Sequence, residues 1–487
     1  MKVDEKNPLA EAPIGKLMTK YAIPSVVALV VNALYNIVDQ IFIGWGVGTL
    51  GNSATNVVFP LSMVVTALSL LLGDGGAAYL SLELGRGNKE KAQKGANNTL
   101  TWLIIVGIVM FLVCFIFLKP LVGMLGATTD NLPYALEYGR IVVCGFPFVV
   151  IGSGLCSVIR SDGTPQLTMI GMIIGCIINV VLDAIFVLGC GWGMTGAAVA
   201  TIIGQIVNFL ITIWYLPHFK TCKINLHDMK PQLSLLSKIA SLGVSSFIAQ
   251  FAVAVVMAVV NYFLVKYGAA SEYGSDIPLA AFGIVMKFNT ILIAVVTGIG
   301  TGAQPIVGYN YGRGDITRVK KTYFLAVKCA TIFSIICFKV CLFNSSNISY
   351  FLAVKCATIF SIICFIVFQA FPYQLTEMFG DQGQLYTQFS IMSFRIFTLL
   401  CFFNGFQVVT AIFFQSIGKP LTSGIISFSR QIIFFIPAVI IWCACVGLNG
   451  VLYAGPTGDG LAFILALVLI LIEMKKLNKM EQSPAGK

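Results

Sequence analysis

The sequence predicts an all-α integral membrane protein with twelve transmembrane helices in two six-helix lobes, related by a pseudo-twofold axis along the membrane normal. Composition is the first observation behind this: 57% of the 487 residues are hydrophobic, 10% are charged, and the mean hydropathy is +0.90. A soluble protein of this length could not bury so much apolar surface, whereas a bilayer solvates it. The lengths of the apolar runs and an internal repeat are the other two observations.

The apolar runs are long enough to cross a bilayer, because about 20 residues of helix span its hydrocarbon core. Twelve such spans follow one another along the chain. We place them at about 17–44, 53–83, 96–118, 134–159, 167–188, 194–216, 236–265, 279–308, one within 322–371, 389–415, 422–445 and 459–474.

Lys and Arg gather at the ends of the chain and in every second loop, while the intervening loops carry almost none. The positive-inside rule then places both termini in the cytoplasm of a multi-pass protein of the plasma membrane, the inner membrane of the cell. The net charge of +11 reflects this topology, so we expect contact with membrane lipid and no nucleic-acid partner. The basic residues are Lys2, Lys6, Lys16, Arg86, Lys89, Lys91, Lys94, Arg160, Lys220, Lys223, Lys230, Arg313, Arg318, Lys320, Lys321, Lys419, Lys475, Lys476 and Lys479.

The two halves of the chain repeat one another. The segment 84–87 (LGRG) recurs as 311–314 (YGRG), and Gly73-x-Gly75 recurs as Gly300-x-Gly302, each 227 residues later. Further on, 160–165 resembles 415–420. Both pairs follow an even number of spans, so the halves share one orientation. We predict an N-terminal lobe at 1–216, a cytoplasmic linker at 217–235 and a C-terminal lobe at 236–487, with substrate bound between rocking lobes.

A tandem duplication interrupts the ninth span. Residues 323–338 (YFLAVKCATIFSIICF) recur letter for letter as 350–365, displaced by 27 positions. If both copies crossed the membrane, every later loop would change sides and Lys419 would face outward, against the charge rule. We therefore predict a 27-residue insertion near 339–365, with only one copy crossing.

Two spans carry a deep carboxylate on a polar face. Asn179 and Asp183 lie four residues apart, so they share one side of a helix. In the first span, Asp39 continues a polar face formed by Asn32, Tyr35 and Asn36, and Pro24 is expected to kink that helix. An ionisable group at membrane depth is a functional-site candidate, and a static polar contact between helices is the alternative.

Asp39, Asp183 and Thr201 of the sixth span all fall in the outer half of the N-terminal lobe, judged by a helical rise of about 1.5 Å per residue. A carboxylate removed from water binds a proton more readily, and a Na⁺ can instead sit between two of them. Oxygens of Asn179 and Thr201 would complete a cage for a small cation. We expect H⁺ or Na⁺ as the coupling ion, no cofactor, and no metal or disulfide framework among the 14 Cys.

The chain resembles the MATE (multidrug and toxic compound extrusion) transporters, nearest their DinF/MepA-like branch, over roughly residues 15–475. The resemblance implies export of cationic or amphipathic compounds in exchange for H⁺ or Na⁺. It implies a cation site at Asp39, Asn179, Asp183 and Thr201, and bending of the first helix at Pro24. The motifs are Pro24…Tyr35-x-x-x-Asp39, 84–87, Arg160-Ser161-x-Gly163-x-Pro165, Asn179-x-x-x-Asp183, Gly196-Ala197-Ala198-x-Ala200-Thr201, Gln304-Pro305-x-x-Gly308-Tyr309-Asn310-Tyr311-Gly312 and Gln415-Ser416-x-Gly418-Lys419-Pro420.

Other polar residues carry less weight. Lys287 lies deep in the eighth span and is a candidate cavity residue, with burial against a carbonyl or a snorkelled outer position as the alternatives. Asp74, between Gly73 and Gly75, is a candidate cavity residue, but a role in close helix packing beside small residues is favoured. Asp459 and Glu473 fall near span ends, so the C-terminal lobe is expected to hold no deep carboxylate, and ion coupling belongs to the N-terminal lobe.

The residues predict a monomeric ion-coupled carrier that is not an enzyme, and the resemblance implies that it is an antiporter that exports drugs or toxic metabolites and contributes to antibiotic resistance. One alternative is a flippase of lipid-linked precursors from the related superfamily, whose cavity would need several cations for a pyrophosphate. The other is a membrane receptor or channel without alternating access. The two-lobe repeat and the paired carboxylates favour the antiporter.

Overall fold

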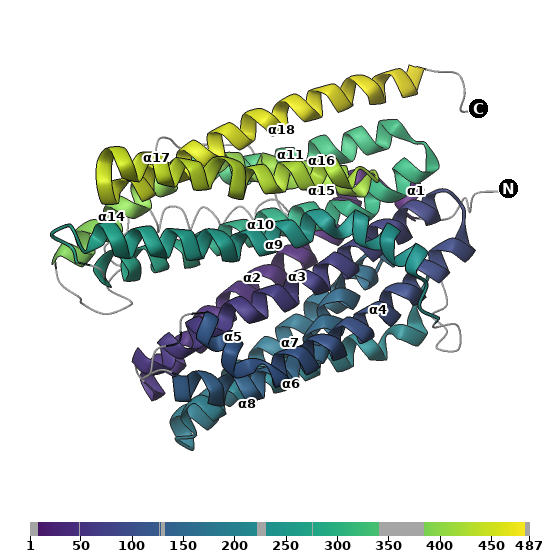
Figure 1. The fold of residues 1–487 in the computed structure, drawn as a ribbon. Helices are drawn as coiled ribbons and strands as arrows, with labels where there is room; N and C mark the ends of the chain where they lie inside the picture. Colours follow the sequence, from purple (N-terminus) through teal and green to yellow (C-terminus); the bar gives the residue numbers. More distant parts are fainter. Residues whose placement is uncertain are drawn as a thin grey trace.

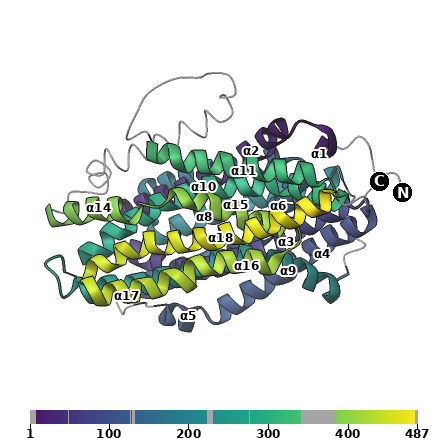
Figure 2. The ribbon, with the colours of Figure 1, turned by 90° about the horizontal axis from the view of Figure 1, so that it is seen from above.

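The computed structural model describes residues 8–47, 49–125, 127, 132–221, 230–274, 276–339 and 384–482. Apart from short turns, these residues are helical, as the sequence predicts. The long helices run side by side along one axis of the molecule (Figures 1 and 2). Several of them are long and apolar enough to cross a membrane.

The N-terminal lobe contains six long helical segments in the order expected from the apolar runs. A short helix, α1 (Pro8–Glu11), precedes them, and α5 (Leu118–Met124) lies between the third and the fourth. The long segments are α2 (Ile14–Gly46), α3 (Thr49–Gly85), α4 (Lys89–Ile116), α6 (Leu132–Ser161), α7 (Pro165–Asp183) continued by the π-helix η1 (Ala184–Gly189), and α8 (Gly193–Trp214), with the 3-10 turn η2 (Leu216–His218) after it.

The C-terminal lobe follows the same plan with two departures from the expected spans. The span predicted at 389–415 is divided into two helices by turns at 398–401. The last helix begins at Gly450, so the loop predicted at 446–458 is wrong for most of its length. The helices are α9 (Leu233–Gly268), α10 (Asp276–Arg313), α11 (Ile316–Lys339), α14 (Gln384–Phe397), α15 (Phe402–Ser416), α16 (Pro420–Phe428), the π-helix η4 (Ser429–Phe435), α17 (Ile436–Val446), the 3-10 turn η5 (Gly447–Asn449) and α18 (Gly450–Gln482).

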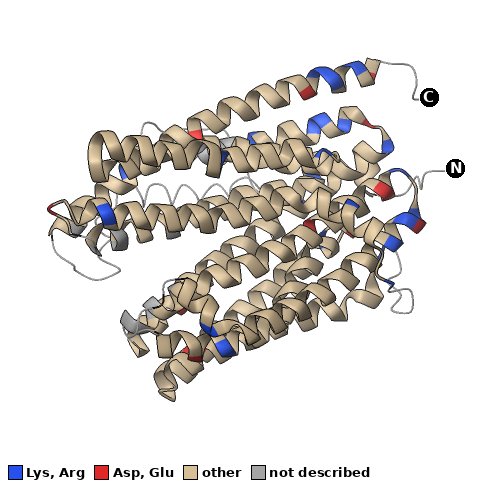
Figure 3. Cartoon of the chain, viewed as in Figure 1, with Lys and Arg blue, Asp and Glu red and all other residues tan. Residues whose placement is uncertain are grey.

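The two lobes lie close together at the end of the molecule that carries α1 and the end of α18, and they diverge toward the opposite end (Figure 1). Lys and Arg concentrate at that same convergent end, while most of the helical length is uncharged (Figure 3). The charge pattern read from the sequence is therefore a spatial pattern as well.

Glycines of the internal repeat let the lobes meet backbone to backbone. A Cβ on Gly75 of α3 would lie 2.1 Å from the carbonyl oxygen of Ile239 in α9, and one on Gly302 of α10 would lie 2.5 Å from Cα of Ala22 in α2. No side chain fits at such distances. Their repeat partners Gly73 and Gly300 instead face helices of their own lobes, at Gly154 and Ile412. The repeated motif thus builds the same pair of contacts twice.

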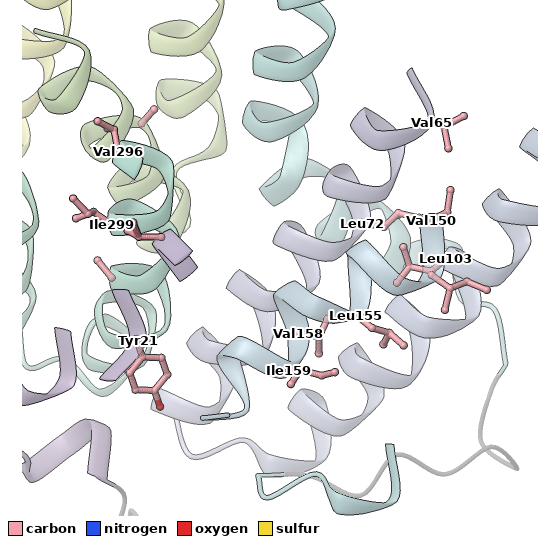
Figure 4. Packing of buried hydrophobic residues seen from close by; sticks show 14 of the residues in the cluster. Tyr21, Val65, Leu72, Leu103, Val150, Leu155, Val158, Ile159, Val296 and Ile299 are labelled. Carbon is pink, nitrogen blue, oxygen red and sulfur yellow. The ribbon is translucent and has the colours of Figure 1, made fainter. Parts of the chain in front are cut away.

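Apolar packing fills each lobe. In the N-terminal lobe, side chains of α3, α4 and α6 point toward one another, as Leu72, Leu103, Val150 and Leu155 show (Figure 4). All four are buried. The same cluster continues across the convergent end into α10, where Val296 and Ile299 are buried.

Both ends of the inter-lobe linker are held by the N-terminal lobe. Asp162, after α6, accepts hydrogen bonds from the backbone N–H groups of Lys220 and Thr221, at 2.9 and 2.8 Å. Asn98 of α4 accepts one from the N–H of Gln232 at 2.9 Å and donates one to the carbonyl of Lys230. The N-terminal lobe therefore holds the linker as far as Gln232, the residue before α9. The lobe boundaries themselves remain predictions.

The first copy of the duplicated segment, 323–338, forms most of α11. Its Tyr323 is buried and its hydroxyl lies 2.9 Å from Thr410 Oγ1 of α15, so this copy packs as part of the lobe. The second copy and most of the predicted insertion at 339–365 lie outside the described residues.

Candidate functional site

The four predicted cation-site residues come from three helices of the N-terminal lobe. Asp39 lies on α2, Asn179 and Asp183 on α7, and Thr201 on α8. All four are buried, and Asp183 has no exposed surface. Asp183 ends α7 where the backbone widens into η1, and such π-helical turns are frequent at functional sites.

Close helix packing positions these side chains. A Cβ on Gly175 would lie 2.7 Å from the carbonyl oxygen of Gly204, so α7 and α8 can approach only because both positions are glycine. The same contact puts Gly204 beside Asn179, because a Cβ added to Gly204 would lie 3.1 Å from the Cβ of Asn179. Asn179 on α7 and Thr201 on α8, each within a turn of this contact, are thereby held next to the same space.

The carboxyl groups of Asp39 and Asp183 are electrostatic neighbours, although they lie 144 positions apart in the chain. Asn179 adjoins Asp183. Tyr35 of α2 and Tyr138 of α6 also lie near both carboxylates, and Tyr138 adjoins Thr201. Sequence reasoning missed Tyr138, because a single tyrosine in an apolar span carries no spacing signal.

Several polar atoms of this site lack a hydrogen bond within the described part of the chain. They are Asp39 Oδ1, both oxygens of Asp183, both polar atoms of the Asn179 amide, and Thr201 Oγ1. Burying such atoms without partners is costly, and two adjacent carboxylates repel each other when both are charged. A proton or a small cation removes both problems, because carboxylate, amide and hydroxyl oxygens are the ligands that hard cations prefer.

The predicted polar face of α2 contributes only in part. Tyr35 and Asp39 reach the site, whereas the exposed Asn36 donates its amide to the Asn32 carbonyl within α2, at 2.6 Å. Helix α2 runs from Ile14 to Gly46 with Pro24 inside it. Bending at Pro24 therefore stays a prediction.

Asp74 joins the two lobes near their convergent end. Its carboxylate accepts hydrogen bonds from Ser157 of α6 at 2.6 Å and from Ser246 of α9 at 2.8 Å, and Arg160 lies 3.6 Å away. Gln304 of α10 donates to the Asp74 carbonyl at 3.2 Å. Asp74 therefore does more than allow close packing, because Ser246 and Gln304 belong to the other lobe.

The C-terminal lobe does hold a half-buried carboxylate deep along a helix, so the expectation that it holds none is wrong. Because α18 begins at Gly450, Asp459 lies nine residues inside the helix, about 13 Å from its start. Its Oδ1 accepts a hydrogen bond of 3.1 Å from Nε of Arg430 in η4. Lys287 lies in α10, and its side chain is outside the described part of the structure.

Comparison with known proteins gives consistent results. The family model described as MatE matches residues 24–185 and 245–355. A "Multidrug export protein MepA" of Staphylococcus aureus (strain MRSA252) is 22% identical over 98% of both chains, and one of Staphylococcus haemolyticus (strain JCSC1435) is 26% identical over 70% of this chain and 74% of its own. A solved structure described as the MATE multidrug transporter DinF-BH in complex with rhodamine 6G is 31% identical, with a TM-score of 0.82 over 97% of this chain and 98% of its own. An outward-facing MATE family transporter gives a TM-score of 0.84 at 22% identity, over 99% of this chain and 100% of its own.

Proposed function

The chain belongs to the MatE family of multi-pass membrane transporters, and we propose that it exports organic compounds in exchange for H⁺ or Na⁺. Members of this family are transporters and not enzymes, and they fold as twelve helices in two lobes. The relatives named above are multidrug exporters, and one is described in complex with a dye, rhodamine 6G. Small organic compounds of that kind are therefore the proposed cargo.

The observation that carries the coupling proposal is the group of buried oxygens on Asp39, Asp183, Asn179 and Thr201, which lack hydrogen bonds within the described chain. Ion exchange requires a site that is stable when it holds the ion and strained when it does not. Two adjacent carboxylates behave in this way, since losing the shared proton or cation leaves two like charges side by side. Strain of this kind can drive α2 to move relative to α7.

Alternating access requires contacts between the lobes that form in one state and break in the other. The hydrogen bonds from Ser246 and Gln304 to Asp74 are contacts of this kind, at the convergent end of the lobes. We propose that they hold the convergent end closed while the opposite end exposes the cargo site. Coupling-ion binding would then act by changing the balance between the two arrangements.

We further propose that the convergent end faces the cytoplasm of the plasma membrane, because the Lys and Arg residues gather there. Cysteine labelling in a thiol-free background tests this orientation. Lys230→Cys should react only after permeabilisation, and Gln384→Cys should react in intact cells. The reverse pattern would contradict the proposed topology.

Transport into everted membrane vesicles tests the export function. Vesicles containing the protein should take up rhodamine 6G when an H⁺ gradient or a Na⁺ gradient is imposed with the higher concentration in the lumen, and the gradient that works identifies the ion. Vesicles with the Asp39→Asn/Asp183→Asn variant are the matched control. Uptake driven by neither gradient, with protein present and folded, would refute ion-coupled export of this dye.

A further inference from the structure

A second polar cluster, with two buried and two half-buried members, occupies the middle of the C-terminal lobe. It consists of Arg430 of η4, Asp459 of α18, and Asn404 and Gln407 of α15. Arg430 lies ten residues after Pro420, about 15 Å into its crossing, and Asp459 lies about 13 Å into its own. Both charges therefore sit near the centre of a hydrocarbon layer about 30 Å thick.

Stability alone does not account for this cluster. A buried ion pair contributes little compared with apolar residues of similar volume, because removing two charges from water costs nearly as much as their attraction returns. The backbone around the pair is also irregular. Arg430 lies in the π-helix η4, and Asn404 follows the turns at 398–401 that divide α14 from α15. Irregular backbone at membrane depth is typical of sites that bind a ligand.

The pair leaves binding capacity unused. Among the described residues, Arg430 donates one hydrogen bond, from Nε to Asp459, although a guanidinium offers five donors. The Arg430 side chain is 15% exposed to solvent, and the Asp459 side chain is 14% exposed. Gln407 donates to the Asp459 carbonyl at 2.6 Å, but its Oε1 and the Oδ1 of Asn404 lack hydrogen bonds in the described chain, and both residues are 2% exposed.

We propose that this cluster binds a zwitterionic group of the transported compound, a proposal that rests on the export function above. The free donors of Arg430 hold a carboxylate, because the planar guanidinium matches the two oxygens of that group. The unpartnered oxygens of Asn404 and Gln407 accept hydrogen bonds from an N–H or ammonium group of the same compound, while Asp459 remains the partner of Arg430 Nε. The N-terminal site, built from acids and neutral groups, offers no such place for a carboxylate.

Aromatic rings border the cluster and fit the flat body of such a compound. Phe403 stacks on Phe463 with ring centroids 4.1 Å apart, and Phe406 meets Phe463 edge to face at 5.1 Å. Phe403 is next to Asn404 in the chain, and Phe463 lies one helical turn after Asp459. The charged groups and the rings therefore belong to one region between α15 and α18.

A pair of dyes that differ only at the carboxylate tests the proposal. Rhodamine 6G is an ethyl ester with a positive charge, and its free acid, rhodamine 19, adds a carboxylate to the same ring system. Dissociation constants for both dyes are measured by fluorescence anisotropy on the purified full-length protein, and export is measured in vesicles. Arg430→Gln should weaken binding of the acid about ten-fold and leave the ester within about two-fold, and Arg430→Lys should restore part of the loss.

Two further variants separate this role from a structural one. Asp459→Asn removes the competing carboxylate, so it should bind the acid at least as tightly as the unmodified protein. If Arg430→Gln does not fold, Arg430→Gln/Asp459→Asn neutralises both partners and should show the same loss for the acid alone. Equal weakening of binding for both dyes, or an unchanged ratio of their two dissociation constants in whichever variant folds, would overturn the proposal. The proposed export function would still stand, provided that the unmodified protein exports rhodamine 6G. An unmodified protein that exports neither dye would instead contradict the proposed function, and this inference with it.

Discussion

Each lobe holds a deep carboxylate next to a π-helical turn, but the two lobes balance its charge differently. In the N-terminal lobe, Asp183 has a second carboxylate, Asp39, as its neighbour. In the C-terminal lobe, Asp459 is paired with Arg430. A site with two acids needs a proton or a cation from outside, whereas a site with its own guanidinium does not. We therefore propose that ion coupling belongs to the N-terminal lobe and that the C-terminal lobe holds part of the cargo.

The largest effect is expected from neutralising the acids of the N-terminal lobe. Asp39→Asn or Asp183→Asn should abolish ion-driven rhodamine 6G transport in vesicles, because neither variant can take up and release the coupling ion. Glu473→Gln is the matched control in the other lobe, since this buried carboxylate is paired with Lys419 at 2.5 Å, and it should keep the transport. If Glu473→Gln abolished transport as well, the loss would follow from neutralising any buried acid, and the assignment of coupling to one lobe would be wrong.

A smaller effect is expected from removing one contact between the lobes. Ser246→Ala deletes the hydrogen bond to the Asp74 carboxylate from the C-terminal side, and a hydrogen bond to a charged group contributes about 1.5–3 kcal/mol. The population with the convergent end open should therefore rise at least about ten-fold. Spin labels at Lys91→Cys and Lys475→Cys, on different lobes, would report it as longer distances. Ser237→Ala is the control, since the Ser237 hydroxyl bonds only within α9 among the described residues. No change in the distance distribution for Ser246→Ala would argue against a gating role of Asp74.

The neutral residues of the N-terminal site should matter less than its acids. Asn179→Ala and Thr201→Ala each remove one oxygen, so the ion concentration for half-maximal transport should rise about three- to ten-fold while the maximal rate is retained. Titrating the luminal pH or the luminal Na⁺ of everted vesicles measures this. Asn36→Ala is the control, because its side chain is exposed and bonds within α2. A complete loss of transport in Thr201→Ala would contradict this prediction, because it would mean that transport depends on the Thr201 hydroxyl as strongly as on the two acids.

The smallest effect is expected from deleting residues 339–365. The deletion joins Phe338 to Ile366 and regenerates one uninterrupted copy of the repeated segment. The first copy already packs against α15 through Tyr323, so the shortened chain should be as stable and as active as the full one. Thermal stability and dye transport of the two proteins would be compared side by side. A shortened protein that fails to insert would show that the extra segment is a working part of the C-terminal lobe.

The sequence was sufficient for most of the described long helices and for naming the candidate residues of the N-terminal site. Asp39, Asn179 and Asp183 could be found because a carboxylate in an apolar run is unusual and because helical spacing puts Asn179 and Asp183 on one face. Tyr138 could not be found, since its role depends on α6 lying against α8 and α2. The start of α18 was misplaced by about nine residues because 450–458, with Gly, Pro and Thr, reads as a loop.

The sequence by itself determined that this chain consists largely of long apolar helices, which of its loops are basic, and that its halves repeat. These properties depend on hydrophobicity and on spacing along one chain, and both are visible in one dimension. The tertiary structure alone decided that Asp39 faces Asp183, that Asp74 contacts the opposite lobe, and that Asp459 has Arg430 as its partner. The reason is physical: whether a buried charge is paired or left without a partner depends on helices that are far apart in sequence.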